Sequence, residues 1–370
     1  MYTPKKTNIS IVVPIYNASQ HIPNLIEGVF RQTYANWELL LVNDGSKDNS
    51  LQVCQSYQQK DSRIKVLHQE NQGPSAARNA GLLAATGDWV TFVDADDCLL
   101  DCFLSSMVNM LNEEQPVDIV FAGYVVVEAS QNNIYTYHSA VYRGYDAVKE
   151  VISKTNILYR CCPWGKMFRR SVMIEHNVLF DTQLAHSEDR LFVYDFLIHT
   201  KGIATTSAIG YLYDSTQTGT LKNKVLSIDK LKCRQQKLTI AAHKVIDHFK
   251  LEGAELFPIV KHLIPLFATA VQGFYYVMGN TKRTQVEQLK FYNENFDKSL
   301  YFKIKELEVW RQFAGNNEML ILALNCQFAK INTKLSIIDK KIRLKSLINQ
   351  FFSVKSVVRL FSKSVTILNK

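Results

Sequence analysis

The sequence predicts an α/β fold: a mostly parallel sheet with helices on both faces, followed by a helical C-terminal region. Five runs rich in apolar and β-branched residues are typical of buried strands, at residues 9–15, 37–42, 63–68, 89–93 and 117–124. Helical spacing separates the first four runs, for example at 21–31 and 73–85. Strands that alternate with helices imply parallel pairing through crossovers. From about residue 225 the pattern is almost wholly helical.

Length and composition indicate a globular protein of more than one domain. The chain has 370 residues, of which 47% are hydrophobic and 21% charged, an ordinary globular mixture. We expect residues 1–125 and 126–220 to form two halves of one α/β domain, and 225–330 to form a helical region. The start of the chain has no apolar signal segment, and the seven cysteines lack metal-site spacing. We therefore expect reduced cysteines in a cytoplasmic protein.

Two apolar segments near the C-terminus raise the question of membrane contact. Residues 262–281 contain no Lys, Arg, Asp or Glu, but Pro265 and Gly273 interrupt them and the apolar part is short for a span. A buried or interfacial helix is the favoured interpretation. The segment from Lys330 to Lys370 has ten basic residues and one acid, Asp339, so it accounts for the whole net charge of +9.

The basic tail, residues 331–370, has the pattern of an amphipathic helix. Its apolar residues follow one another at alternating steps of three and four, at Leu344, Leu347, Phe351, Val354, Val358, Phe361, Val365 and Leu368. Three interpretations remain open: binding to an anionic membrane surface, pairing with a second copy, or docking on the helical region. We favour the membrane surface. No nucleic-acid recognition module accompanies the basic residues, so no nucleic-acid partner is expected.

Polar clusters follow four consecutive predicted strands. They read "PIYNAS", "NDGSKDNS", "NQGPSAARN" and "DADD". In open α/β sheets, ligands bind in the crevice beyond the carboxyl ends of the strands, so these clusters predict a shared binding site. The first cluster contains no glycine, which argues against the GxGxxG turn of a dinucleotide fold. It also lacks the Gly-rich basic loop that a nucleotidyltransferase would need.

The acids of "DADD" suit a metal-bound diphosphate. Asp94 and Asp96 lie two residues apart on an extended chain and therefore point to the same side. Mn²⁺ or Mg²⁺ takes oxygen ligands, often one or two carboxylates completed by substrate phosphates. Asp97 and Asp101 are expected instead to cap the following helix.

These motifs together resemble the family 2 glycosyltransferases of the GT-A fold. The similarity rests on "SIVVPIYN", "ELLLVNDGSKDNS", "NQGPSAARNAGLLAATGDWVTFVDADD", "PWGKMF" and "SEDRLF", and covers about residues 8–215. It implies metal-dependent, inverting transfer of a sugar from a nucleotide-diphosphate donor, usually a UDP-sugar. It also implies a glycan or lipid-linked glycan acceptor and a role in bacterial polysaccharide or lipopolysaccharide biosynthesis. With the basic tail, this suggests a peripheral location on the inner face of the plasma membrane.

The resemblance assigns roles to residues of the first half. The residues that would line the nucleoside pocket are Pro14, Tyr16 and Asn17. Asp44 would hydrogen-bond the uracil edge, and Arg78 would lie near the donor. Asp94 would face the ribose or donor sugar, and Asp96 would hold the metal.

In the second half, the resemblance makes Asp189 the general base, with Glu188 as the neighbour that could take its place. The plainer alternative is a helix start, with Ser187 as N-cap and acids in the first turn. Trp164 would stack on an acceptor sugar and Lys166 would reach the diphosphate. A buried Trp beside an exposed Lys is the alternative for that pair.

One departure from the family pattern concerns the strand after "SEDRLF". Many relatives end this strand with Arg or His, whereas this chain has Tyr213 and Asp214. An acid there would repel phosphate unless it binds the metal. This keeps a second hypothesis open: a catalytically silent nucleotide-binding scaffold in a glycan assembly complex. Association into a homo-oligomer is compatible with either hypothesis.

Overall fold

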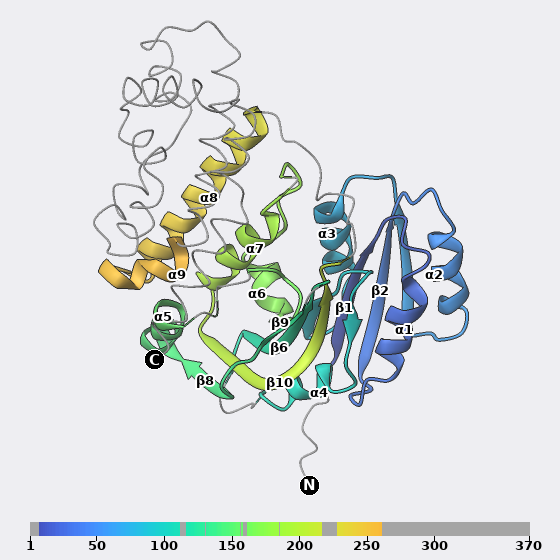
Figure 1. The fold of residues 1–370 in the computed structure, drawn as a ribbon, viewed down its shortest axis with the longest axis horizontal. Coiled ribbons are helices and arrows are strands. Elements are labelled where there is room, and N and C mark those ends of the chain that lie inside the picture. Colours follow the sequence, from blue (N-terminus) through green and yellow to red (C-terminus); the bar gives the residue numbers. More distant parts are fainter. Residues whose placement is uncertain are drawn as a thin grey trace, which may run out of the picture. The chain divides into compact units, whose positions relative to one another are not determined.

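The computed structural model describes residues 7–111, 116–129, 131–155, 157, 161–184, 186–216 and 228–260. The chain divides into two compact units, one formed by residues 1–151 and 160–224 and the other by 152–159 and 225–370. The ribbon of Figure 1 shows the elements of each unit. The predicted basic tail, 331–370, and the uncharged segment 262–281 lie outside the described residues, so their predictions stay untested.

The first unit is built on one ten-stranded mixed sheet. Its main path runs β3-β2-β1-β4-β9-β6-β10-β5, with β7 paired to β6 and β8 paired to β10. The strands are β1 (Ile9–Ile15), β2 (Trp37–Asp44), β3 (Ile64–Gln69), β4 (Trp89–Phe92), β5 (Cys98–Leu99), β6 (Ile119–Val127), β7 (Asn132–Tyr135), β8 (Ala140–Arg143), β9 (Lys166–Arg169) and β10 (Gly202–Asp214). The five strands predicted from sequence correspond to β1, β2, β3, β4 and β6.

The sheet is parallel only in part. Strands β1 to β4 are parallel to their neighbours among themselves, as predicted. The predicted fifth strand, β6, does not pair with β4, because β9 lies between them and is antiparallel to both. Strand β10 then runs parallel to β6. The α/β class predicted above is confirmed, with a mixed second half.

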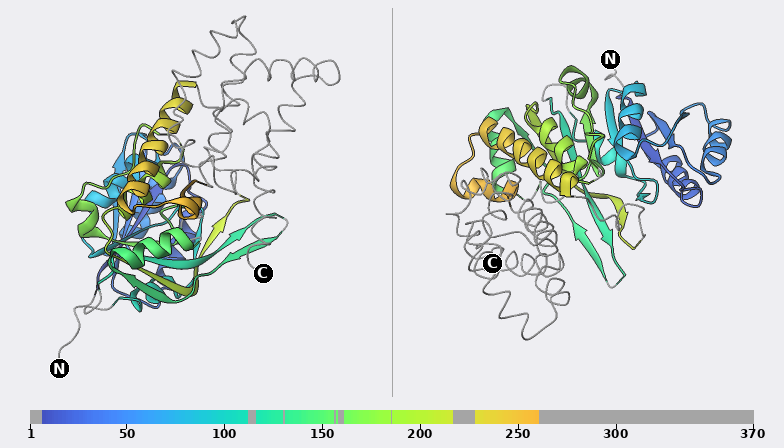
Figure 2. Two further views of the ribbon diagram at one scale, coloured as in Figure 1. Left: turned by 90° about the vertical axis from the view of Figure 1, so that its left-hand side faces the viewer. Right: turned by 90° about the horizontal axis from the view of Figure 1, so that it is seen from above.

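The helices of the first half cover both faces of the sheet. Helices α1 (Ile22–Phe30) and α2 (Ser50–Gln58) lie on one face, and α3 (Pro74–Ala84) lies on the other (Figure 2). This follows from right-handed crossovers, because the chain reverses direction across the sheet between β3 and β4. Gly81 lets α3 approach β1 closely: a Cβ built on it would lie 2.3 Å from Val12 Cγ1.

Among the described residues, four more helices and an aromatic core follow α3 along the chain before β10. These helices are α4 (Phe103–Val108), α5 (Gly144–Lys154), α6 (Arg170–Glu175) and α7 (Glu188–Leu197). Phe192 of α7 stacks on Phe180 with ring centroids 4.0 Å apart, and meets Phe92 of β4 edge-on at 5.5 Å. These rings pack α7 against β4 and against the loop that contains Phe180. The packing fixes the position of the first turn of α7.

The described part of the second unit ends at residue 260, so the predicted helical region 225–330 stays a prediction beyond that residue. The described part contains α8 (Ile228–His248), the 3₁₀ turn η1 (Gly253–Leu256) and α9 (Phe257–Val260). Across the described ranges of both units, no helix combines the length and apolar character that crossing a bilayer requires.

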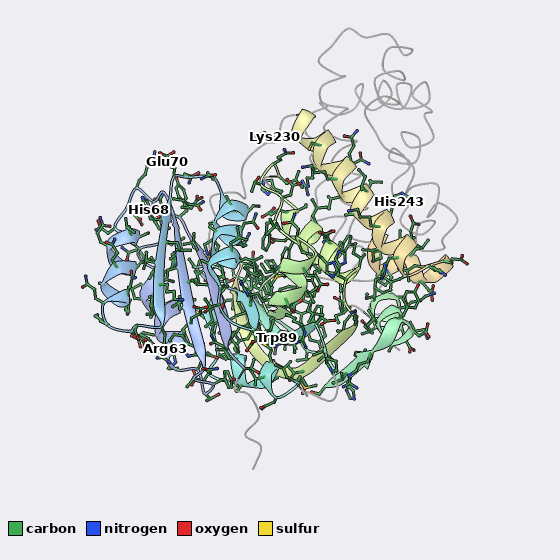
Figure 3. All side chains as sticks on the ribbon, turned by 180° about the vertical axis from the view of Figure 1, so that it is seen from behind. Arg63, His68, Glu70, Trp89, Lys230 and His243 are labelled. Atoms are coloured by element: carbon green, nitrogen blue, oxygen red, sulfur yellow. The ribbon has the colours of Figure 1, made fainter. Side chains whose placement is uncertain are left out.

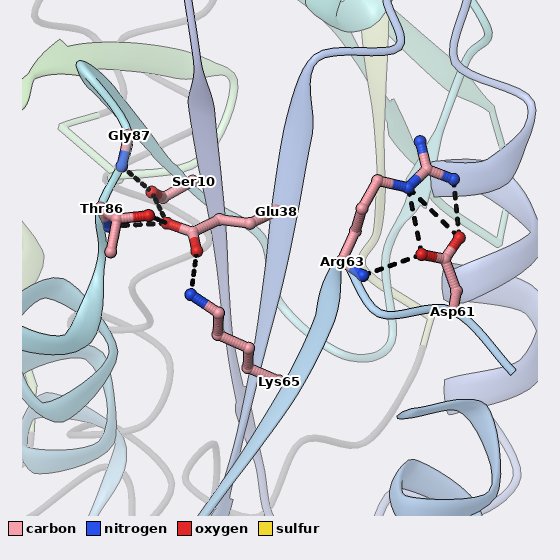
Figure 4. A network of polar contacts seen from close by, with 7 residues as sticks. All are labelled: Ser10, Glu38, Asp61, Arg63, Lys65, Thr86 and Gly87. Atoms are coloured by element: carbon pink, nitrogen blue, oxygen red, sulfur yellow. Dashed lines mark hydrogen bonds and ion pairs between the residues drawn. The ribbon is translucent and has the colours of Figure 1, made fainter. Parts of the chain in front are cut away.

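Different polar residues lie at the starts and at the ends of the strands. Figure 3 shows Arg63 and Trp89, near the strand starts, at one edge, and His68 and Glu70, at the end of β3, at the other. At the starting edge, the buried carboxylate of Glu38 accepts hydrogen bonds from Ser10 Oγ at 2.6 Å and from the backbone N of Thr86 at 2.6 Å. Lys65 Nζ lies 2.7 Å from its second oxygen (Figure 4). Glu38 thus ties β1, β2 and β3 to the turn before β4.

Candidate active site

The turns after β1 and β2 are hydrogen-bonded to each other at the carboxyl ends of these strands. Asn17 has a left-handed backbone, with φ of 50°. Its N–H donates to Ser46 Oγ at 3.0 Å, and its side-chain oxygen accepts from the N–H of Lys47 at 2.7 Å. Pro14 and Tyr16 are partly buried just before it. The structure therefore brings the predicted nucleoside-pocket residues next to the "NDGS" turn.

Asp44 organises the turn between β3 and α3. It is buried, and its carboxylate accepts from the N–H of Gln72 and of Gly73, both at 2.8 Å, and from Gln69 Nε2 at 2.8 Å. These donors use both carboxylate oxygens and fix the start of α3. The uracil-binding role stays a prediction, and it would have to coexist with these bonds.

Arg78 is the centre of the polar site. It lies on α3, is 5% exposed, and places its guanidinium among three carboxylates. Its Nη2 is 2.8 Å from Asp94 Oδ1, and its Nη1 is 3.5 Å from Asp189 Oδ1 and 3.7 Å from Glu188 Oε1. Burial opposes the charge, but the three acids outweigh it and raise the pKa of Arg78. One arginine thus joins the turn after β4 to the start of α7.

Asp189 lies at the start of α7 and has a raised pKa. Burial raises its pKa to about 7, and the charges of Glu188 and Asp94 act in the same direction, while Arg78 opposes them. A third of its side chain remains exposed, whereas Glu188 is almost fully buried. Accessibility therefore favours Asp189 over Glu188 for contact with an acceptor. Ser187 stands at the N-cap position as predicted, but its side chain makes no capping bond.

Asp97 does not cap a helix, contrary to the prediction. It is 2% exposed and accepts from Tyr211 Oη at 2.5 Å and from the N–H of Asp214 at 3.2 Å. Burial, with Asp94 and Asp96 nearby, raises its pKa to about 9. The same Tyr211 hydroxyl accepts from the N–H of Asp94 at 3.2 Å. Asp97 and Tyr211 thus attach the acidic turn, residues 94–97, to the end of β10.

Asp101 is also not a cap. Its carboxylate pairs with Arg31 at 3.2 Å on the surface, and α4 begins after Cys102 without a side-chain capping bond.

The predicted contacts of Trp164 and Lys166 with substrate do not fit this structure. Trp164 is 4% exposed and stacks on Tyr211 and Tyr213, with centroids 4.9 and 5.1 Å away. Lys166 is 2% exposed, and its ammonium donates to the carbonyls of Cys162 at 2.7 Å and Trp164 at 3.4 Å. The indole faces an aromatic cluster and the lysine holds the preceding turn. The alternative of an exposed Lys is wrong as well, because both residues are buried.

Asp214 closes its own turn. Asp214 Oδ1 accepts hydrogen bonds from the backbone N–H of Thr216 at 2.9 Å and from the Thr216 hydroxyl at 2.5 Å. Sequence reasoning singled out this position but missed Tyr211, whose hydroxyl contacts both Asp94 and Asp97. The signal was available in the period of two along "GYLYD", which places Tyr211 and Tyr213 on one face of the strand.

The donor set of the acidic turn suits a hard divalent cation shared with a ligand. Asp94 pairs with Arg78, and Asp96 is partly buried in the same turn; the metal role of Asp96 stays a prediction. Among the residues that the structure describes, no three His, Cys, Asp or Glu side chains come together as a metal site. A cation here would therefore need oxygens from a phosphate group, which is the usual coordination of Mg²⁺ beside a nucleotide.

The arrangement of the sheet and its helices is that of the GT-A fold. A solved structure of TarS from S. aureus, residues 1–349 in complex with UDP-GlcNAc, has a TM-score of 0.65 against this chain. The alignment covers 86% of this chain and 88% of that TarS chain at 20% identity, so it shows a shared fold.

The sequence is similar to known glycosyltransferases over part of its length. Residues 10–176 match the profile described as Glycosyl transferase family 2. The chain is 39% identical over 153 residues to glycosyltransferase GlyG of Streptococcus pneumoniae serotype 4, covering 41% of this chain and 49% of GlyG. It is 34% identical over 191 residues to EpsH of Bacillus subtilis strain 168, covering 50% and 54%. The chain thus spans about half the length of these curated relatives.

Proposed function

We propose that this chain is a metal-dependent, inverting glycosyltransferase that uses a nucleotide-diphosphate sugar, with UDP-sugars as the first donors to test. The observation that carries the proposal is the Arg78 cluster, which brings Asp94 and Asp189, 95 residues apart in the sequence, to one guanidinium. The shared fold with TarS, solved with UDP-GlcNAc, supports starting from UDP. The acceptor class proposed is a glycan or a lipid-linked glycan of a bacterial surface polysaccharide.

In this proposal Asp189 takes the proton of the attacking acceptor hydroxyl. The hydroxyl oxygen forms the new bond to the anomeric carbon, and the bond from that carbon to the diphosphate breaks with its electron pair on the leaving group. Because the pKa of Asp189 is raised to about 7, its ionised form is a stronger base than an ordinary aspartate while remaining populated near pH 7. Arg78 holds this carboxylate at a fixed distance from Asp94.

Asp96, helped by the phosphate oxygens of the donor, would hold Mn²⁺ or Mg²⁺. When bound, the cation would supply positive charge that makes the diphosphate a better leaving group. Asp44 and the turn around Asn17 would form the nucleoside side of the site.

The first test is thermal unfolding with UDP, GDP or CMP, each with and without Mn²⁺. A ligand at about 100 times its Kd stabilises the folded state by about 2.7 kcal/mol, which is a shift of several degrees in a chain of this size. We expect stabilisation by UDP that needs Mn²⁺ and is lost in Asp96→Ala. Asp101→Ala, which removes a surface acid paired with Arg31, is the matched control and should keep the shift.

A second candidate function is the silent nucleotide-binding scaffold. It is favoured by the end of β10, where Asp214 bonds to Thr216 and supplies no cation for a diphosphate. Turnover separates the two candidates: release of UDP from a UDP-sugar, abolished in Asp189→Asn, supports the transferase. UDP binding with no turnover of any donor, equal in wild type and Asp189→Asn, would support the scaffold instead.

A further inference from the structure

An aromatic row begins at the acidic turn and crosses three neighbouring strands. The register pairs Tyr211 of β10 with Tyr124 of β6, and Tyr124 with Tyr135 of β7. Register partners lie on the same face of a sheet, and Tyr213, two residues after Tyr211, lies on that face too. Figure 2 shows the β6–β7 hairpin extending beside the end of β10.

The members of the row touch one another through their rings. Trp164 stacks on Tyr211 and on Tyr213 and meets Tyr124 edge-on at 5.1 Å. Tyr124 in turn stacks on Tyr135 with centroids 4.9 Å apart and planes 16° apart. The row is anchored at the site, because the Tyr211 hydroxyl contacts Asp94 and Asp97.

Exposure divides the row into a buried support and an accessible outer pair. Tyr211, Tyr124 and Trp164 are 0%, 3% and 4% exposed, whereas Tyr135 and Tyr213 are only partly buried against this core. Packing on buried rings holds the outer tyrosines in place, so a ligand that stacks on them orders little flexible side chain. The outer rings therefore have the properties of a prepared binding surface.

We propose that Tyr135 and Tyr213 form a stacking platform for the acceptor glycan, a proposal that rests on the transferase function above. A sugar ring has apolar C–H faces and polar edges. A tyrosine offers the matching combination of an apolar ring face and a hydroxyl. The platform takes over the role that the sequence assigned to Trp164, which lies behind it as support.

The row connects the platform to the chemistry by direct contacts. Asp189 is 3.5 Å from Arg78, Arg78 is 2.8 Å from Asp94, and the Asp94 N–H is 3.2 Å from the Tyr211 hydroxyl. Arg78 and Lys166, the buried cations near the row, are both engaged by protein oxygens, so the platform is suited to the neutral sugar part of an acceptor.

The test measures oligosaccharide binding directly, so that no donor turnover is needed. Saturation-transfer NMR on the full chain would use cellotriose, maltotriose, chitotriose and a β-1,4-linked galactotriose as probes. We expect at least one to bind, and its affinity to fall about tenfold in Tyr135→Ala and in Tyr213→Ala, as for loss of one stacking contact. Tyr135→Phe and Tyr213→Phe, which keep the ring, should retain most of the binding.

Ile134→Ala is the matched control. Ile134 neighbours Tyr135 on β7 but points to the opposite face and is 64% exposed, so its removal should leave oligosaccharide binding unchanged. Binding that is equal in the two Ala variants and wild type, or no binding of any probe by folded wild type, would overturn the platform. UDP binding measured on the same samples separates this from the proposed function. UDP binding without oligosaccharide binding refutes only the platform. Oligosaccharide binding without UDP binding refutes only the proposed donor site.

Discussion

Replacing Glu38 by glutamine should destabilise the first unit by about 3 kcal/mol at pH 7. Burial would raise the pKa of Glu38, but Lys65, Ser10 and Thr86 outweigh it and lower the pKa from 4.5 to about 2. Each unit of pKa difference between the folded and unfolded states corresponds to about 1.4 kcal/mol, which gives about 3 kcal/mol for this group. The side chain is 8% exposed, so solvent screens these contacts little.

The pH dependence gives the prediction its specific form. Because the folded-state pKa is lowered, the ionised carboxylate contributes its full stability above the unfolded value of 4.5, and this contribution disappears as pH falls toward 2. Glutamine has a similar shape but no charge, so the variant lacks the contribution at every pH. The stability difference between wild type and Glu38→Gln should therefore shrink between pH 4.5 and pH 2.

Thermal and urea unfolding of both proteins at several pH values would measure this difference. In a domain of this size about 3 kcal/mol corresponds to a Tm decrease of about 6–12 °C. Glu27→Gln, an exposed acid on α1, is the control and should change Tm by about a degree or less. A Glu38→Gln difference below about 1 kcal/mol, or one that persists unchanged at low pH, would refute the assigned role of the network.

Three further outcomes are expected. The kcat/KM for sugar transfer should fall about tenfold per pH unit below pH 7, because protonation of Asp189, whose pKa is about 7, removes the base; a flat profile would contradict this. Arg78→Gln should move that limb to higher pH, since Arg78 lowers the pKa of Asp189, and an unmoved limb would exclude the coupling. Gly81→Ala should lower stability by about 1–3 kcal/mol in urea unfolding, because the new methyl group meets Val12, whereas Leu83→Ala on the exposed face of α3 should not.

The first half of the fold was predictable because local patterns determine it. Strands β1, β2 and β4 are buried on both faces and read as apolar runs, and a helix follows each of the first three strands. Strand β9 was missed because its four residues include a buried lysine and a partly exposed arginine beside only two apolar residues. Its place in the sheet depends on partners such as Thr91, whose hydroxyl donates to the carbonyl of Lys166.

The candidate site was predictable in composition but less so in contacts. The sequence identified the acids at the ends of β4 and at the start of α7, and the structure brings Asp94 and Asp189 to one arginine. The sequence-based prediction for Asp97 was wrong, because a carboxylate before a helix is usually a cap. In the structure Asp97 instead accepts a hydrogen bond from Tyr211, 114 residues away. Sequence reasoning also misjudged Trp164, since the residue type alone cannot distinguish a tryptophan that meets a ligand from one that supports other rings.

The central position of β9 has a consequence for synthesis on the ribosome. Strands β4 and β6 are complete by Val127, but the strand that joins them spans Lys166–Arg169. Until that segment leaves the exit tunnel, each of the two strands has an open edge, the kind of surface that pairs wrongly with other chains. Translation of the intervening 38 residues, 128–165, takes about 2–8 s at about 5–20 residues per second, so β4 and β6 wait at least this long for the strand that joins them.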